Sequence, residues 1–341
     1  MDTADPRVTD VWFDNLEKAL GGRKPDYLVV QHMEPDHAGN IKKLAEKYPE
    51  MKIVGNAKTF PMMKQFFTID GLDDRSVVVK EGDTLSLGNH TLQFVMAPMV
   101  HWPEVMVTYE SAEKVLFAAD AFGKFGTLDT DEDWACEARR YYFNIVGKYG
   151  MPVQALLKKA ENLDIQIICS LHGPILKEDL GYYINLYKTW SSYEPEDKGV
   201  FIAYSTLHGN TGNAAKKLAE LLKEKGCPKV VVSDLAREDM AECVEDAFRY
   251  DRMVLASPTY DGGLMPVMMD FIYHLKSKAY QNRTVGFIEN GSWAPMSGKL
   301  MKEQMAAMKN INIIEDVVTV KSALKAADEA KLEGLADKLM D

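Results

Sequence analysis

Residues 27–37 of the chain read YLVVQHMEPDH. The apolar run Tyr27–Val30 predicts a short buried strand. Four side chains that can bind a metal follow it within six residues, namely His32, Glu34, Asp36 and His37. The end of a buried strand holds such side chains on a rigid element. We therefore predict a metal site at the carboxyl end of this strand.

Three more residues of the same kind follow other strand-like runs. They are His101, Asp120 and His172, after the runs Phe94–Met96, Val115–Ala119 and Ile165–Ser170. Histidine and carboxylate ligands without a thiolate favour iron or manganese and still permit zinc. Up to seven ligands exceed the four of one tetrahedral ion, so the set predicts a pair of ions with Asp120 as a candidate bridge.

Length and composition narrow the class of protein. The 341 residues predict roughly two domains, and the net charge of −11 argues against a general nucleic-acid binder. No apolar run approaches the ~20 residues that span a bilayer, and the N-terminus lacks the features of a signal peptide. We expect a cytoplasmic protein that does not contact membrane. The four cysteines form no C-x-x-C pair, which argues against a zinc ribbon or a rubredoxin-like site.

The chain divides near Lys198. The polar segment Trp190–Lys198 ends a helical pattern, and the apolar run Val200–Tyr204 begins directly after it. Such a junction predicts one domain over residues 1–195 and a second over residues 198–341.

The second domain alternates strands and helices. The predicted strands are Val200–Tyr204, Lys229–Val232, Met253–Ala256, Thr284–Ile288 and Ile313–Val320. The predicted helices are Thr211–Lys225, Asp239–Tyr250, Met265–Tyr280, Ser297–Lys309 and Ala326–Met340. This alternation predicts a doubly wound parallel α/β sheet.

The first domain mixes helices with short strands. Besides the runs already named, the predicted strands are Met51–Val54, Ser76–Lys80, Thr84–Leu87, Thr91–Met96 and Val105–Tyr109. The predicted helices are Ile41–Lys47, Thr59–Phe67, a stretch over Glu132–Asn162 broken near Gly150 and Pro152, and Leu180–Trp190. The pattern favours an α+β or a layered αββα fold.

A loop rich in small and hydroxyl residues follows the first strand of the second domain. It reads STLHGNT over Ser205–Thr211 and leads into a helix. Backbone N–H groups and hydroxyls at such a helix N-terminus can hold a phosphate. The chain has neither G-x-x-x-x-G-K-[ST] nor G-x-G-x-x-G, so an ATP-type P-loop and a dinucleotide site are not expected. The alternative is an ordinary helix cap.

The same run resembles the FMN-phosphate loop of flavodoxins. Two later loops follow the third and fourth strands, where flavodoxins hold the flavin ring. The resemblance implies FMN contacts from Ser205, Thr206, Leu207, His208, Gly209, Asn210 and Thr211, from Pro258, Thr259, Tyr260, Asp261 and Gly262, and from Glu289, Asn290, Gly291, Ser292 and Trp293. Tyr260 or Trp293 could stack on the flavin, and either could equally be a surface aromatic.

The metal motif resembles that of the metallo-β-lactamase fold, H-x-H-x-D-H, with Glu34 in place of the second histidine. H-x-E-x-D-H with later His, Asp and His is similar to the flavodiiron proteins. The resemblance implies that His32, Glu34 and His101 bind one iron, that Asp36 and His172 bind the other, and that Asp120 bridges them. His37 matches a family position whose ligation varies.

What the family does sets the functional expectation. The resemblance implies that an external carrier, such as rubredoxin or a reduced deazaflavin, reduces FMN. Electrons then pass to a diiron site that reduces O2 to water or NO to N2O. It also implies a head-to-tail homodimer or a tetramer. Members begin with further strands before the segment that matches Met1–Pro6, and no rubredoxin or flavin-reductase module follows Asp341, as in the two-domain class.

Two other classes stay open from the sequence. A zinc-dependent hydrolase of the lactamase fold would use a metal-bound hydroxide, but Glu34 and the FMN-like loops argue against it. A flavodoxin-like electron carrier with an inactive metal domain would bind FMN and no iron. The metal and flavin content of the purified protein separates the three readings.

Overall fold

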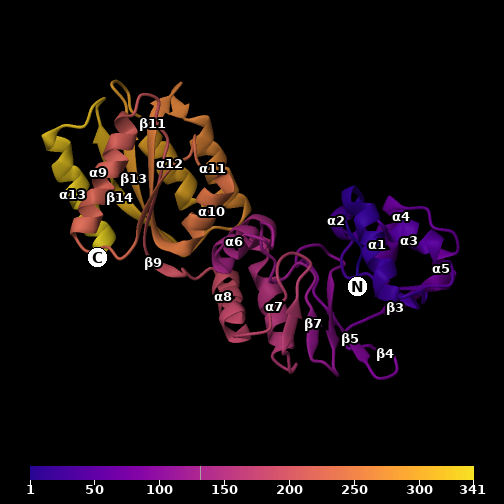
Figure 1. The fold of residues 1–341 in the computed structure, drawn as a ribbon. Coiled ribbons are helices and arrows are strands. Elements are labelled where there is room, and N and C mark those ends of the chain that lie inside the picture. Colours follow the sequence, from indigo (N-terminus) through magenta and orange to yellow (C-terminus); the bar gives the residue numbers. More distant parts are fainter. Residues whose placement is uncertain (131) are drawn as a thin grey trace. The chain divides into compact units, whose positions relative to one another are not determined.

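The computed structural model describes residues 1–130 and 132–341, and the chain forms two compact units (Figure 1). The first unit comprises Met1–Glu132 and Met151–Tyr187, and the second comprises Asp133–Gly150 and Lys188–Asp341. The second unit therefore includes a segment that lies well before the predicted junction. The domain boundaries of 195 and 198 stay a prediction.

The first unit contains a three-stranded parallel sheet in the order β1-β2-β3. Its strands are β1 (Tyr27–Val29), β2 (Lys52–Asn56) and β3 (Ser76–Val79). Its helices are η1 (Pro6–Val8), α1 (Thr9–Leu20), α2 (Pro35–Ala38), α3 (Ile41–Lys47), α4 (Thr59–Phe66) and α5 (Leu72–Arg75). Leu28 and Ile53 pack with these helices, whereas Val29 and Val54 pack with the second sheet. This alternation along each strand places one apolar layer on either face.

The second sheet of this unit has five strands in the order β4-β5-β6-β7-β8, and only β7 and β8 pair in parallel. They are β4 (Thr84–Ser86), β5 (Thr91–Met96), β6 (Met106–Glu110), β7 (Val115–Phe117) and β8 (Ile167–Cys169). Helices α7 (Gly150–Ala160) and α8 (Leu180–Ser192) lie beside this sheet (Figure 1). The layered αββα prediction is confirmed.

Two features of the first half differ from the prediction. Helix α1 was not predicted, because acidic residues interrupt its short apolar stripe. The helical stretch over Glu132–Asn162 breaks earlier than predicted, after α6 (Trp134–Tyr141), into a π-helical turn, η2 (Tyr142–Val146), and a 3-10 turn, η3 (Gly147–Tyr149). The backbone carbonyl of Asn144 accepts a hydrogen bond from Lys278 Nζ at 2.8 Å, so a tertiary partner contributes to this break.

The second unit contains the predicted parallel sheet. Its strands are β9 (Asp197–Tyr204), β10 (Val230–Asp234), β11 (Tyr250–Tyr260), β13 (Arg283–Asn290) and β14 (Ile311–Val320), and β12 (Gly263–Leu264) pairs only with β11. The order β10-β9-β11-β13-β14 is the flavodoxin-like order. In such sheets a ligand binds outside the carboxyl ends of the strands, where the strand order reverses.

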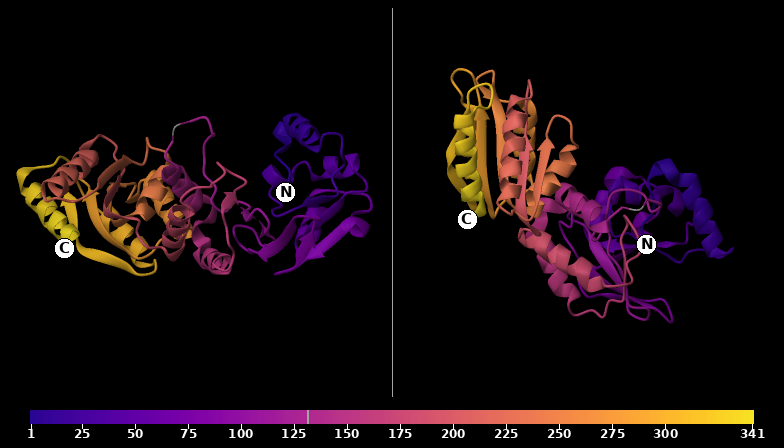
Figure 2. Two further views of the ribbon diagram at one scale, coloured as in Figure 1. Left: turned by 60° about the horizontal axis from the view of Figure 1, so that its bottom comes forward. Right: turned by 60° about the vertical axis from the view of Figure 1, so that its left-hand side comes forward.

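Helices cover both faces of this sheet (Figures 1 and 2). They are α9 (Asn210–Glu224), α10 (Met240–Arg249), α11 (Pro266–Ser277), α12 (Ser297–Ala306) and α13 (Ala326–Met340). Val200 and Ile202 pack in one core with α9 and α13, whereas the ring of Phe201 lies 6.2 Å from that of Phe271 on α11. The doubly wound architecture is confirmed.

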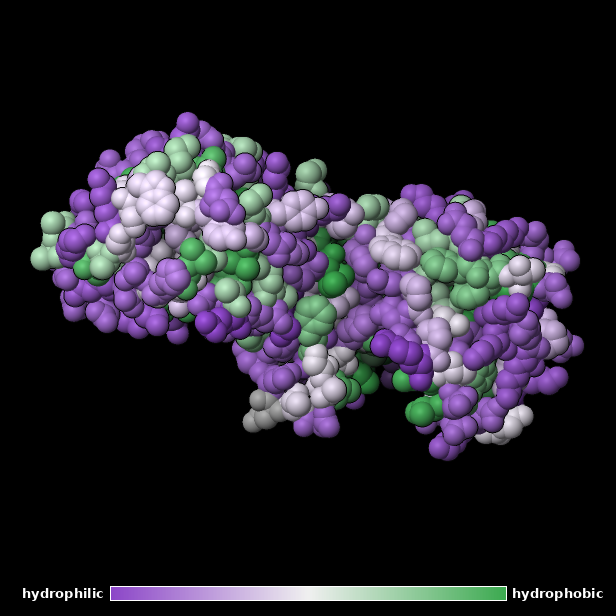
Figure 3. All heavy atoms as spheres, turned by 90° about the horizontal axis from the view of Figure 1, so that it is seen from above, coloured by the Kyte–Doolittle hydropathy of each residue, from purple (hydrophilic) through white to green (hydrophobic). Residues whose placement is uncertain are grey.

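In the part of the chain that the structure describes, no helix is both long enough and apolar enough to cross a membrane. Hydrophilic residues make up most of the face seen in Figure 3, and apolar residues occur there in small groups.

Candidate functional site

The predicted metal ligands all lie just beyond strand ends of the first unit. His32 and Glu34 follow β1, and Asp36 and His37 belong to α2. The other three are His101 between β5 and β6, Asp120 after β7, and His172 after β8. The two packed sheets bring these loops together, although His32 and His172 lie 140 residues apart in the sequence.

The first cluster consists of His32, Glu34, His101 and Asp120. Oε2 of Glu34 lies 3.2 Å from Nε2 of His32 and 3.0 Å from Nε2 of His101. Oδ2 of Asp120 lies 3.4 Å and 3.1 Å from the same two nitrogens. Two imidazole nitrogens and two carboxylate oxygens thus converge on one point.

The second cluster consists of Asp36, His37 and His172. Nε2 of His37 lies 3.0 Å from Nε2 of His172, and Oδ2 of Asp36 lies 3.2 Å and 3.3 Å from these nitrogens. His37 therefore lies with the second cluster.

Asp120 lies between the two clusters. Its Oδ2 faces the first cluster, while its Oδ1 lies 3.1 Å from Nε2 of His37 and 3.6 Å from Nε2 of His172. A carboxylate with one oxygen toward each cluster has the geometry that a bridging ligand needs.

The histidines and carboxylates of the first cluster shift one another's pKa. Burial opposes the charged form of His32, but hydrogen bonds to Glu104 and Glu34 outweigh it and raise its pKa to about 10. Burial acts likewise on His101, where Asp120 and Glu34 raise the pKa to about 9. The same contacts with His101 and His32 lower the pKa of Glu34 to about 2. A cation placed among these atoms would compete with protons for the same nitrogens.

Two buried carboxylates behind the clusters were not predicted. Oε1 of Glu104 lies 2.9 Å from Nδ1 of His32 and accepts from the N–H of Met33 at 2.8 Å. Asp2 accepts from the N–H groups of Gln31 and His32 at 2.7 and 3.2 Å. Both acids are almost fully buried. Both acids lie far from His32 in the sequence, so local patterns do not predict that they bond the segment of His32. The one available signal is that Glu104 follows soon after His101.

A third cluster of acidic and thiol groups lies in the second unit and comprises Cys136, Glu242 and Glu245. Oε2 of Glu245 already pairs with Nη1 of Arg139 at 2.8 Å. This carboxylate has a cationic partner, so we do not assign it to a metal.

The predicted phosphate loop leads from β9 into α9. Gly209 precedes the helix with φ +86°, and its N–H donates to Oγ1 of Thr206 at 3.1 Å. Ser205 is buried and hydrogen-bonds Ser257 through its hydroxyl at 3.1 Å. The first N–H groups of a helix lack partners within the helix, so the start of α9 is a candidate anion site.

The three predicted flavin loops line one pocket of about 550 Å³ at the carboxyl ends of the strands. This volume suits a cofactor site. Its lining includes Thr206, Leu207, His208, Asn210, Thr211, Pro258, Thr259, Asp261, Gly262, Asn290, Gly291, Ser292 and Trp293, together with Ala294 and Ser322, which the sequence did not predict.

Four predicted flavin contacts are not among the lining residues. Ser205 is buried, Gly209 lines an adjacent hollow, and Tyr260 is exposed. Glu289 accepts hydrogen bonds from the N–H of Gly298 at 2.9 Å and the hydroxyl of Thr319 at 2.7 Å. Its carboxylate therefore joins α12 to β14.

Comparison with known families agrees with both units. Residues 2–173 match the ODP family beta lactamase, and residues 201–314 match a flavodoxin domain. Together the matches reproduce the predicted order of domains along the chain.

Similar proteins match most of this chain. A nitric oxide reductase of Moorella thermoacetica is 29% identical over 325 residues, which span 93% of this chain and 80% of that protein. An anaerobic nitric oxide reductase flavorubredoxin of Escherichia coli is 28% identical over 86% of this chain, which spans 63% of that protein. The solved structure of rubredoxin oxygen:oxidoreductase from Desulfovibrio gigas has a TM-score of 0.91 and 26% identity, over 99% of this chain and 86% of that one.

A β-lactamase-like domain followed by a flavodoxin domain defines a class of redox flavoproteins. The chain belongs to the ODP beta-lactamase family and, with its flavodoxin domain, to the flavodiiron proteins. Membership of this family implies FMN and a diiron site.

Proposed function

We propose that the chain reduces O2 to water, NO to N2O, or both, at a diiron site supplied with electrons through FMN. The observation that carries the proposal is the position of Asp120, with one carboxylate oxygen toward each cluster. Two metal ions held in this way can bind both ends of a small substrate.

The residues fit a pair of iron ions. Their donors are imidazole nitrogens and carboxylate oxygens without a thiolate, which suits iron or manganese. Among the described residues, Oδ1 of Asp36 is buried and has no hydrogen-bond partner. The facing nitrogens of His37 and His172, 3.0 Å apart, also support a cation between them.

The role of each side chain follows from this assignment. His32, Glu34 and His101 would hold one ion, Asp36, His37 and His172 the other, and Asp120 both. When bound, the diiron group supplies the redox chemistry that reduces the gas. Glu104 fixes the ring of His32 so that Nε2 faces the cluster.

The flavin pocket would hold FMN with its phosphate at the N-terminus of α9. Trp293 lines that pocket and is 83% exposed, so it can move onto the flavin ring. The electron donor in this proposal is a rubredoxin or a reduced deazaflavin, and the working form is a head-to-tail homodimer or a tetramer.

The test compares the wild type with Asp120→Asn and with Asp14→Asn, an exposed acid on α1 of the same unit. Iron, zinc and FMN per chain and the consumption of O2 and NO are measured after anaerobic purification. We expect Asp120→Asn to keep FMN, to lose metal and to consume neither gas, because one carboxylate serves both clusters. Asp14→Asn should match the wild type.

Other results would contradict the proposal. Zinc without flavin in the wild type would indicate a hydrolase. FMN without iron, even after anaerobic reconstitution, would indicate an electron carrier. Full consumption of O2 and NO by Asp120→Asn would show that Asp120 does not bridge the two clusters.

A further inference from the structure

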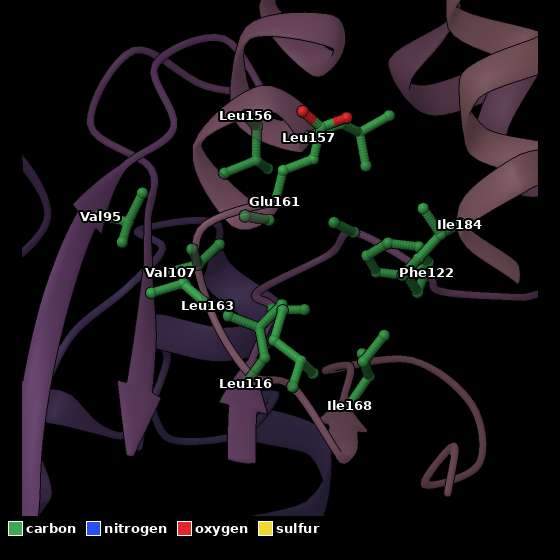
Figure 4. A pocket seen from close by; sticks show the side chains of 14 residues that line it. Val95, Val107, Leu116, Phe122, Leu156, Leu157, Glu161, Leu163, Ile168 and Ile184 are labelled. Carbon is green, nitrogen blue, oxygen red and sulfur yellow. The ribbon is translucent and has the colours of Figure 1, made fainter. Parts of the chain in front are cut away.

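The first unit also contains an apolar cavity of about 190 Å³, which is open to solvent on the side of Glu161 (Figure 4). It lies between the five-stranded sheet and the helices α7 and α8. Side chains from both layers surround it, among them Val107, Leu116, Leu157 and Ile184. Of the residues that line it, only Glu161 is polar, and this residue is exposed.

Protein interiors are normally packed as densely as organic crystals, so a void of this size is unusual. Apolar cavities in proteins stay dry and take up small apolar molecules such as xenon. Here the deep wall is formed by fully buried side chains, including Ala118 and Ile168, which offer no polar group to hold water.

One short segment separates this cavity from the metal clusters. Ala118, Ala121 and Phe122 line the cavity, while Asp120 in the same segment faces the clusters. We call residues 118–122 the strap. The cavity and the clusters therefore lie on two sides of one strand-end loop.

The strap is firmly held. The N–H of Phe122 donates to the hydroxyl oxygen of Tyr187 at 2.6 Å, and the carbonyl of Ala119 accepts from the N–H of Leu171 at 2.8 Å. Ala119 and Phe122 have φ of 49° and 64°, which non-glycine residues rarely adopt. Such a conformation persists only where the surroundings impose it. The backbone of the strap is thus fixed, and any passage from the cavity to the clusters runs past its side chains.

We propose that this cavity is a binding site for a dissolved diatomic gas, O2 or NO, which it holds beside the strap and releases toward Asp120 past Phe122. Both gases are small and nearly apolar, so they gain from transfer out of water into an apolar void. The inference deepens the proposed function and rests on it for the identity of the gas.

The first test uses xenon as the probe. The full chain is examined by 129Xe NMR and by diffraction from xenon-pressurised crystals, both free of metal and loaded with iron. Ala160→Leu fills the cavity from the last residue of α7, and Leu163→Phe fills it from the following loop. Ala155→Leu is the matched control, because Ala155 is exposed on the same helix and does not line the cavity.

We expect saturable xenon binding by the wild type and by Ala155→Leu, and its loss in both filling variants, with or without metal. In the loaded enzyme the filling variants should raise KM for the gas by about threefold or more and leave kcat unchanged, because they remove binding that precedes the reaction. Thermal unfolding reports whether each variant is folded. One folded filling variant is enough for the test.

The proposal is overturned if the wild type does not bind xenon, if folded filling variants still bind it, or if xenon binding is lost with KM unchanged. Failure of the proposed function looks different. In that case the wild type and its metal-free form bind xenon in the cavity, and the loaded protein reduces neither gas.

Discussion

Buried carboxylates decide how the metal ligands are oriented. Glu104 is fully buried and bonds Nδ1 of His32, which holds a proton on Nδ1 and turns Nε2 toward Glu34 and Asp120. Asp2 holds the backbone of the same segment. Partners of this kind commonly change metal affinity 10- to 100-fold, roughly.

Replacing Glu104 tests this role. Glu104→Gln keeps an oxygen acceptor for His32 but removes the charge, so we expect a loss of Fe(II) affinity of about tenfold. Glu104→Ala leaves the Nδ1–H group buried without its partner and should cost more. Anaerobic Fe(II) titration measures both, with the exposed Glu113→Gln as control. Equal affinity in all three variants would show that Glu104 does not position His32.

A buried acid in the second unit makes stability depend on pH. Burial first, and then the nearby carboxylate of Glu242, raise the pKa of Asp246 to about 6 despite the opposing charges of Arg249 and Arg139. In the unfolded chain the pKa of an aspartate is near 3.9. Below that pH the carboxyl is protonated in the folded and the unfolded protein, and its contribution to stability is fully present. Its contribution is lost as pH rises through about 6.

We expect the wild type to lose up to about 3 kcal/mol between pH 4 and 7 through this one group, and Asp246→Asn to lose correspondingly less. Urea unfolding at a series of pH values measures the difference between the two proteins. Asp270→Asn, on the neighbouring α11, has an exposed carboxylate and should follow the wild type. Parallel pH profiles for Asp246→Asn and the wild type would refute the assignment.

Among the elements, helix α9 follows the predicted phosphate loop. It begins after Gly209 with φ +86° and ends before Gly226 with φ +83°. A Cβ at either position meets no atom within 4 Å, so only backbone strain opposes a substitution. The two glycines thus differ mainly in their distance from the phosphate loop.

This pair gives an internally controlled prediction. Gly209→Ala and Gly226→Ala should each lower stability by about 1–2 kcal/mol, because an L-residue is strained in the left-handed region. Only Gly209→Ala should also weaken FMN binding, by about tenfold, since it reshapes the loop that presents the amides. Flavin fluorescence titration and urea unfolding provide the two readouts. A similar loss of FMN affinity in both variants would mean that helix stability, not loop geometry, controls binding.

For the whole molecule, the two compact units have separate cores. A ligand that binds one folded unit stabilises that unit by mass action. We expect two unfolding transitions in calorimetry. FMN should raise the midpoint temperature of one, and Fe(II) or Mn(II) should raise that of the other. Asp120→Asn should abolish the metal-induced shift and leave the FMN-induced shift intact. A single transition raised by both ligands would show that the units unfold together.

The sequence alone was enough for the layered fold, the doubly wound sheet and the family. Strand periodicity and the polar residues after each strand are local signals, and parallel strands must bring their carboxyl ends to one edge. For that reason the seven candidate ligands and the three candidate flavin loops could be named from the sequence, and the structure brings the ligands together in two groups. Helix α1 and the turn at Tyr142–Val146 were not predicted, because tertiary contacts stabilise them and the local sequence pattern does not mark them.

Only the tertiary structure decided how side chains face one another. It placed the oxygens of Asp120 toward different clusters, set Glu104 behind His32 across 72 residues, and turned Glu289 toward Thr319 instead of the pocket. It also left the apolar cavity beside the strap. These features depend on packing between distant segments, which local sequence patterns do not encode.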